Sequence, residues 1–269
     1  MSIPQYWWVG VLGMFVLPGV LGPLGTGLQD EVVPVGVFSE MDPSPTLPEG
    51  WYRISLAAAF DETTYELVSG THGAVVRARS ENATGSLATD LRVDLHTHPI
   101  LEWRWKVSTI IPEARSDNKF RDDSPARVFI SFDYDGLDLV QRLQHVAMRA
   151  LGYDAVPTRA IAYFWGNAEP RHVVLDNTRA EWIQMVPVRN RADSTGAWVT
   201  ERRNVRADYR RIFGEDPPPV ERVAFMTDTQ NTGRRVTAFY GDIVFRSGGP
   251  DTAHVDTMLH VQRGEAGRH

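Results

Sequence analysis

The chain has 269 residues, a formal net charge of −6 and a hydrophobic content of 42% that includes eight tryptophans. This is enough apolar material for a packed core, and it excludes a chain that is disordered throughout. The acidic balance argues against a nucleic-acid partner, because phosphate binding depends on clustered Lys and Arg. The sequence has no cysteine, which excludes disulfides and thiolate chemistry.

Residues 1–28 are predicted to be a signal peptide or an uncleaved N-terminal anchor. No charged residue occurs from Tyr6 to Leu28, and residues 9–20 form an apolar run of signal-peptide length. Pro18 and Pro23 interrupt the segment, whereas a membrane span needs about 20 apolar residues. A cleaved signal is therefore favoured. We expect a periplasmic or secreted protein that meets a membrane only through an uncleaved N-terminal segment.

The rest of the chain divides by composition into three parts. Residues 29–47 are rich in Pro, Gly and acids and are predicted to be a linker, and residues 249–269 a polar tail. Residues 48–248 are predicted to form a single domain. Its strands, indicated by alternation and flanking turn residues, are expected at 51–59, 65–69, 72–80, 87–95, 101–107, 127–132, 160–165, 181–188, 220–227 and 235–245.

The clearest of these strands is 101–107. Four apolar residues alternate there with three charged ones, which predicts one face in a core and one charged face. The apolar set is Leu101, Trp103, Trp105 and Val107, and the charged set is Glu102, Arg104 and Lys106.

Two helices are predicted among the strands. Residues 138–152 begin with an Asp138–Gln141 capping box and carry an apolar stripe through Leu143, with Gly152 as the stop. Residues 197–213 form the second helix, ended by Gly214. The fold class expected is therefore mainly all-β, a jelly-roll-like β-sandwich with two inserted α-helices. No Gly-rich nucleotide loop follows a strand, which argues against a parallel α/β sheet.

Six short motifs, in this order, resemble the bacterial family catalogued as domain of unknown function 3047, over roughly residues 48–246. They are Leu101-Glu102-Trp103-Arg104-Trp105-Lys106-Val107, Asp122-Asp123-Ser124-Pro125-Ala126-Arg127-Val128, Tyr163-Phe164-Trp165-Gly166, the segment around Glu201-Arg202-Arg203-Asn204-Val205 with Asp208-Tyr209-Arg210, Thr227-Asp228-Thr229-Gln230-Asn231-Thr232-Gly233, and Tyr240-Gly241-Asp242-Ile243. The resemblance implies an exported β-rich domain and no established reaction.

Two groups of charged residues are candidates for ligand binding. The face of Glu102, Arg104 and Lys106 could bind a sugar or an acidic polymer through charge-assisted hydrogen bonds, or could form cross-strand ion pairs. In the loop before residues 127–132, adjacent Asp122 and Asp123 could ligate Ca²⁺, cap the loop or pair with Arg127. The full predicted ligand-binding set is Glu102, Arg104, Lys106, Asp122, Asp123, Arg127, Trp165 and Arg202.

Helical spacing places Arg202, or Glu201 beside it, on the apolar face of the second predicted helix. A charge there needs a buried partner, for which Asp122, Asp123 or Asp242 is the natural candidate.

Metal binding is considered at two further places. Asp228 and Asn231, with Asp242, make an oxygen-rich turn that could hold a structural Ca²⁺, although a hairpin turn held by Asx side-chain bonds is favoured. Asp94, His96 and His98 alternate and could face one side to bind a transition metal. No other cofactor is expected.

Three functions follow as hypotheses. The first is an exported module that binds a carbohydrate or another polar ligand. The second is a polysaccharide-active hydrolase or lyase using Glu102, Asp123 and Arg104, with Asp133 as another possible carboxylate. The third is a structural cell-envelope protein. No nucleophile elbow, zinc-protease helix or cysteine nucleophile is present, so an enzyme is less favoured than a binding module.

Overall fold

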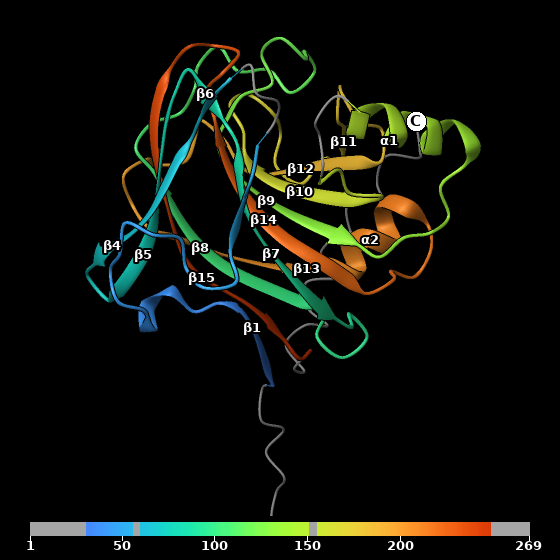
Figure 1. The fold of residues 1–269 in the computed structure, drawn as a ribbon, viewed down its shortest axis with the longest axis horizontal. Helices are drawn as coiled ribbons and strands as arrows, with labels where there is room; N and C mark the ends of the chain where they lie inside the picture. Colours follow the sequence, from blue (N-terminus) through green and yellow to red (C-terminus); the bar gives the residue numbers. More distant parts are fainter. Residues whose placement is uncertain (1–30, 56–59, 151–154, 249–269) are drawn as a thin grey trace, which may run out of the picture.

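The computed structural model describes residues 31–55, 60–150 and 155–248. Two β-sheets pack face to face around a common core (Figure 1). The six-stranded sheet has the order β13-β8-β15-β5-β4, with β1 also paired to β15. Its strands are β1 (Val32–Gly36), β4 (Thr64–Gly70), β5 (Gly73–Glu81), β8 (Ile100–Val107), β13 (Val199–Asn204) and β15 (Arg235–Arg246).

The seven-stranded sheet has the order β11-β12-β10-β9-β14-β7-β2. Its strands are β2 (Tyr52–Ile54), β7 (Ser86–Val93), β9 (Ser124–Phe132), β10 (Ala160–Trp165), β11 (Leu175–Asp176), β12 (Ile183–Arg189) and β14 (Val220–Asp228). A short parallel pair, β3 (Asp61–Glu62) and β6 (Ala83–Thr84), stands apart. With helices α1 (Leu139–Ala150) and α2 (Val205–Phe213), this is the predicted jelly-roll-like β-sandwich.

The core is centred on the strand that the sequence marks most clearly. Along β8 every second side chain, including Trp103 and Trp105, is buried between the sheets, whereas the charged residues between them are partly exposed. Trp103 stacks on Tyr163 with ring centroids 5.5 Å apart, and Trp105 lies 5.9 Å from Trp165. Strict alternation thus identified both the strand and its buried face.

The predicted linker is only partly a linker. Residues 32–36 pair with β15 as strand β1, and a 3-10 turn over Phe38–Glu40 follows. Phe38 is fully buried and contacts Trp51 and Phe225 in the core. The Pro- and Gly-rich composition of this segment predicts a linker, although its apolar residues form a strand and contribute to the core.

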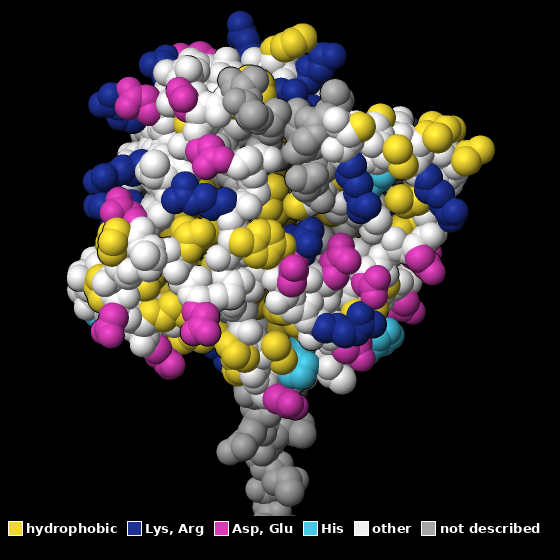
Figure 2. All heavy atoms as spheres, viewed as in Figure 1, with side chains coloured by type: hydrophobic (Ala, Val, Ile, Leu, Met, Phe, Trp, Pro, Cys, Tyr) yellow, Lys and Arg dark blue, Asp and Glu magenta, His cyan; other side chains and the backbone are white. Residues whose placement is uncertain are grey.

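Helix α1 begins as predicted, because the Asp138 carboxylate accepts from Gln141 N over 2.8 Å and Gln141 Oε1 accepts from Asp138 N. Its apolar stripe, however, faces away from the sheet. Leu139, Leu143 and Val146 are 62–73% exposed, and Figure 2 shows hydrophobic side chains on the outer side of this helix, at the upper right.

The second predicted helix is shorter than expected. Residues 199–204 form strand β13, which pairs antiparallel with β8, and helix α2 begins only at Val205. Asn204 is the N-cap, since its side-chain oxygen accepts from Ala207 N over 2.9 Å. Gly214 ends the helix with a left-handed φ of 78°, as predicted.

Residues 1–28 and 249–269, Gly152 and the end of the first predicted strand lie outside the described residues. Among the helices of the described part, none is long and apolar enough to cross a membrane.

Candidate functional site

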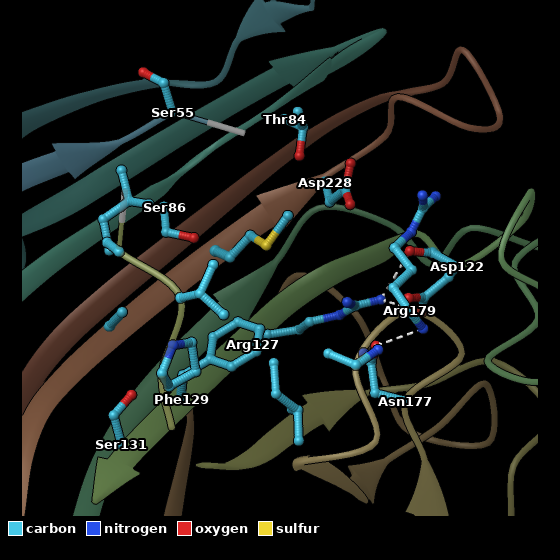
Figure 3. Close-up of a pocket in the computed structure, with 18 of the residues that line it drawn as sticks. Ser55, Thr84, Ser86, Asp122, Arg127, Phe129, Ser131, Asn177, Arg179 and Asp228 are labelled. Carbon is cyan, nitrogen blue, oxygen red and sulfur yellow. Dashed lines mark hydrogen bonds and ion pairs between the residues drawn. The ribbon is translucent and has the colours of Figure 1, made fainter. Parts of the chain in front are cut away.

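A cleft lies over the outer face of the seven-stranded sheet, on the side away from the core (Figure 3). Its volume is about 190 Å³, far more than the 10–15 Å³ or so that a single water needs. β9 and β14 supply the floor, because their alternation sends one set of side chains to the core and the other outward. The outward set includes Arg127, Phe129 and Ser131 of β9 and Ala224, Met226 and Asp228 of β14.

A buried ion pair lies at one end of this floor. Arg127 donates from Nη2 to the Asp122 carboxylate over 2.6 Å and to the Asp122 carbonyl over 2.9 Å. The two side chains are 5% and 4% exposed. Pairing with Arg127 is one of the alternatives that the sequence leaves open for Asp122, and a pair this deep supplies a fixed charge arrangement to the cleft.

Asp228 brings a second carboxylate to the same floor. The side chain comes from the end of β14, which pairs with the start of β9 so that Asp228 lies opposite Ser124. Asp228 is 5% exposed, and within the described residues no ion pair neutralises it. Burial raises the pKa of its carboxyl to about 7, and Asp123 adds to this rise although Arg127 opposes it.

The Asp228 carboxylate accepts one hydrogen bond, from Gln230 N over 3.2 Å, whereas two buried polar atoms of the cleft, Arg127 Nε and Thr84 Oγ1, have no hydrogen-bond partner in the described structure. Thr84 is 4% exposed, and Figure 3 shows its hydroxyl and the Asp228 carboxylate pointing to the same space. A buried polar group without a partner costs about 1–3 kcal/mol. Such groups are uncommon in folded proteins and call for a reason.

The remaining walls of the cleft are largely apolar. Phe129, Ile183 and Met226 cover part of the floor, and Phe60 and Val156 contribute at the sides. The cleft therefore combines hydrophobic surface with a small number of convergent polar groups, which is typical of small-molecule sites.

Asp123 lies next to this site but has a different role. Its carboxylate accepts four hydrogen bonds of 2.6–3.0 Å from the backbone N–H groups and side chains of Asn231 and Thr232. It thereby holds the turn between β14 and β15 against the loop that leads into β9. Both carboxylate oxygens of Asp123, which the Ca²⁺ site at Asp122 and Asp123 would use, are engaged in these bonds.

The other predicted metal ligands are not brought together. Asp242 accepts from Ser39 N and Oγ, at 2.9 and 2.6 Å, instead of facing Asp228. Residues 94–98 form a turn in which Asp94 caps His96 N, and His98 is buried. Across residues 31–55, 60–150 and 155–248 no group of three His, Asp or Glu side chains could hold a metal ion.

The remaining predicted site residues lie elsewhere. Trp165 is wrongly placed among the ligand contacts, because its ring is fully buried in the core. Glu102, Arg104 and Lys106 lie on the outer face of the six-stranded sheet, where β13 aligns Arg202 with Glu102. Glu102 and Asp123 therefore do not form the predicted pair of catalytic carboxylates.

Arg202 is exposed, contrary to the prediction, whereas Glu201, the other residue expected to carry a buried charge here, is 7% exposed and accepts from Arg189 Nε over 2.6 Å. Arg203, which follows Arg202, points to the other side of the strand, where it is partly buried and donates to the buried Asp208 over 2.7 Å, while Tyr163 OH donates to the same carboxylate over 2.8 Å. The error follows from treating residues 199–204 as helix, since a strand places adjacent residues on opposite faces.

Sequence reasoning missed Thr84, Asn177 and Arg179, which also line the cleft. None stands in a motif or a charged run. Only the pairing of distant segments places them here, so the sequence alone offered no signal for them.

A family model described as "Protein of unknown function (DUF3047)" matches residues 49–244. Among proteins with curated descriptions, none matches this chain. Solved structures with a similar fold include a family 29 carbohydrate-binding module complexed with cellulohexaose, at 10% identity and a TM-score of 0.38, covering 84% of this chain and 96% of the module.

Two others are xyloglucanases. The xyloglucanase domain of NopAA from Sinorhizobium fredii, in complex with cellobiose, is 10% identical with a TM-score of 0.41. The match covers 77% of this chain and 98% of the NopAA domain. The family 12 xyloglucanase from Bacillus licheniformis is 11% identical with a TM-score of 0.40, covering 81% and 99%. At these values the likeness concerns the β-sandwich, and no site residue is carried over.

Proposed function

The chain belongs to the DUF3047 family, and from the geometry of its cleft we propose that it binds a carbohydrate or a similarly hydroxylated ligand over the outer face of the seven-stranded sheet. One observation carries the proposal. Thr84 Oγ1 and Arg127 Nε are buried without a partner in the described structure, and they lie in one cleft with the buried carboxyl of Asp228, which accepts one hydrogen bond, from Gln230 N, and has no ion-pair partner among the described residues.

The chemistry of these groups favours a ligand with several hydroxyls. Arg127 Nε can only donate a hydrogen bond, the Thr84 hydroxyl can donate or accept, and Asp228 accepts when ionised and donates when protonated. A sugar hydroxyl can satisfy each of them, because it is both donor and acceptor. The apolar surface of Phe129 and Met226 suits the less polar face of a sugar ring.

The test uses a substitution that removes a ligand contact without removing a contact of the fold. Thr84→Val deletes a hydroxyl that has no protein partner, so the free energy of unfolding should not fall. The full chain is applied to an array of oligosaccharides, and the dissociation constant of a bound glycan is measured by calorimetry. We expect Thr84→Val to weaken binding about fivefold to tenfold, the value of one hydrogen bond.

Thr109→Val, which changes an exposed threonine in the loop after β8, is the matched control and should bind as the unmodified chain does. Asp228→Asn keeps the shape of the side chain and should also weaken binding. Failure of the folded protein to bind any glycan on the array would refute the proposal. So would equal affinity in the unmodified chain, Thr84→Val and Asp228→Asn.

A polysaccharide-active hydrolase is the second candidate. Its catalytic carboxyls would be two that line the cleft, Asp122 and Asp228, in place of the pair predicted from the sequence. Asp122 is held against Arg127, whereas burial raises the pKa of Asp228 to about 7. Two carboxyls in one cleft with such different surroundings can serve as base and acid. Asp228→Asn would then reduce turnover of a bound glycan about 100-fold or more, while binding would change far less.

A site for polysaccharides fits a protein located outside the cytoplasm, where a cell encounters such polymers. We propose export through residues 1–28, which contain no charge from Tyr6 to Leu28. Mass spectrometry of the protein recovered from the periplasm would show cleavage near residue 28, and full-length protein in the cytoplasm alone would contradict export.

A further inference from the structure

The outer face of the six-stranded sheet carries a second feature that the cleft does not use. Here the charged side of β8, predicted as a possible binding surface, meets side chains of β13 and β15. We call the surface around Arg104, Lys106 and Arg202, with the rings of Trp198 and Phe239, the basic face. Each of the three cations projects from the side of its strand opposite to the core.

Three carboxylates on this side of the sheet are already neutralised, and a fourth, Asp242, accepts hydrogen bonds from Ser39 N and Oγ. Glu66 pairs with Arg77 at 2.5 Å, Glu102 with Arg246 at 3.1 Å, and Glu81 with Arg235. By contrast, Arg104, Lys106 and Arg202 take part in no ion pair with any carboxylate of the described residues. In a chain of net charge −6, an excess of positive charge on one sheet face is a local departure from the average.

Aromatic rings hold two of these cations, Arg104 and Lys106, in place. The Arg104 guanidinium lies 4.6 Å from the centre of the Trp198 ring, and Lys106 Nζ lies 4.3 Å from that of Phe239. Arg104 also packs its stem against Gly241, where a Cβ would come within 2.6 Å of Nε. Arg104 Nε is buried without a hydrogen-bond partner. Cations fixed on a rigid sheet lose little entropy when they bind an anion.

From this arrangement we infer that the basic face binds a linear acidic polysaccharide, with Arg104, Lys106 and Arg202 contacting its carboxylate groups. Residues 104 and 106 are separated by about 7 Å along the strand, and the neighbouring strand lies about 5 Å away. The cations thus follow a row that suits an extended, repeatedly charged chain. A neutral glycan would need free aromatic faces for stacking, and here cations lie over the rings.

An anionic membrane is a weaker fit. Peripheral membrane binding normally adds buried apolar side chains to the electrostatic attraction. Of the large apolar residues exposed in the described part, those that are more than half exposed are Phe120, Leu139, Val140, Leu143 and Val146. They lie in the loop before β9 and on α1, not on β8, β13 or β15.

The experiment measures binding of the full chain to immobilised polygalacturonate at ionic strengths of about 20 and 200 mM. Hydroxyethylcellulose is the neutral polymer, and vesicles of phosphatidylcholine and phosphatidylglycerol in equal amounts are the lipid probe. The variant Arg104→Gln/Lys106→Gln/Arg202→Gln removes the three cations. Its control, Arg142→Gln/Arg149→Gln/Arg210→Gln, removes the same charge from the two helices.

We expect binding to polygalacturonate that weakens as salt rises, a loss of about tenfold or more in the basic-face variant, and less than about twofold in the control. If the triple variant fails to fold, the single substitution Arg202→Glu, at an exposed position, should weaken polygalacturonate binding about threefold or more. No binding at low salt, equal losses in both triple variants, equal binding to hydroxyethylcellulose, or binding to the vesicles alone would each overturn the inference. Because Thr84→Val leaves this face unchanged, it should not affect polygalacturonate binding.

Discussion

Arg127 donates to the Asp122 carboxylate over 2.6 Å on the floor of the cleft, and only 5% and 4% of the two side chains is exposed. Removing one partner leaves the other charge buried and uncompensated, which costs far more than the pair itself contributes. The pair therefore constrains every substitution at this end of β9.

We expect Arg127→Met to lower the free energy of unfolding by about 3–5 kcal/mol, and Arg127→Met with Asp122→Leu to recover most of that loss. Urea denaturation of the three proteins gives the double-mutant cycle. Arg92→Met, which removes an exposed partner of Asp133, is the control and should leave the midpoint nearly unchanged. A double variant as unstable as the single one would contradict this account.

The carboxyl of Asp228 predicts how stability depends on pH. Burial raises its pKa from 3.8 to about 7 in the folded protein. Between these values the folded state holds a proton that the unfolded state has lost, so this carboxyl makes the protein less stable as pH rises. The slope approaches about 1.4 kcal/mol per pH unit, and the penalty is complete above the folded pKa.

Asp228→Asn removes this titration. We expect the variant to gain stability relative to the unmodified chain as pH increases from about 4 to 7, with a constant difference at higher pH. Urea midpoints measured across this range would show the divergence. Parallel curves for the two proteins would mean that Asp228 keeps an ordinary pKa.

The turn between β14 and β15 depends on Asp123. Its carboxylate accepts from both Asn231 and Thr232, so Asp123→Ala leaves several donors unsatisfied and should cost about 2–4 kcal/mol. Because these bonds engage the carboxylate, we also expect the melting temperature to stay constant on addition of Ca²⁺ or EDTA. Thermal scans of the unmodified chain with each reagent check this, and a Ca²⁺-dependent rise would restore the metal hypothesis.

The parts of the fold that the sequence predicts are those with undisturbed alternation. In β8 and β9 each inward position is apolar, so strand and buried face follow directly. In β13 the inward position is Glu201, whose carboxylate accepts from Trp105 Nε1 and Arg189 Nε. A charge on the buried side breaks the alternation of a strand, while Trp198, Val205 and Tyr209 fall at helical spacing, so the sequence predicts one helix over 197–213.

The candidate site was predictable only where its residues are neighbours in the chain. Asp122 and Arg127 are five positions apart, and their pairing was among the expected alternatives. Asp228 joins them through the register of β14 on β9, and Thr84 joins them from strand β6, which pairs with β3. Such long-range pairing is set by packing, which no local pattern of this sequence encodes.

The two adjacent arginines at the end of β13 distinguish the observed strand from the helix that the sequence predicts for this segment. Arg203 is bound by Asp208 at 2.7 Å beside the buried Tyr163, whereas Arg202 is exposed on the basic face. We expect Arg203→Met to lower the free energy of unfolding by about 2–4 kcal/mol, because the buried Asp208 would lose the guanidinium that contacts both of its oxygens and keep only Arg211, at 3.1 Å. Arg202→Met should change stability by less than about 0.5 kcal/mol, as at other exposed positions. Urea denaturation of the two variants decides between strand and helix here, since in a helix through residues 197–213 the larger loss would fall on Arg202.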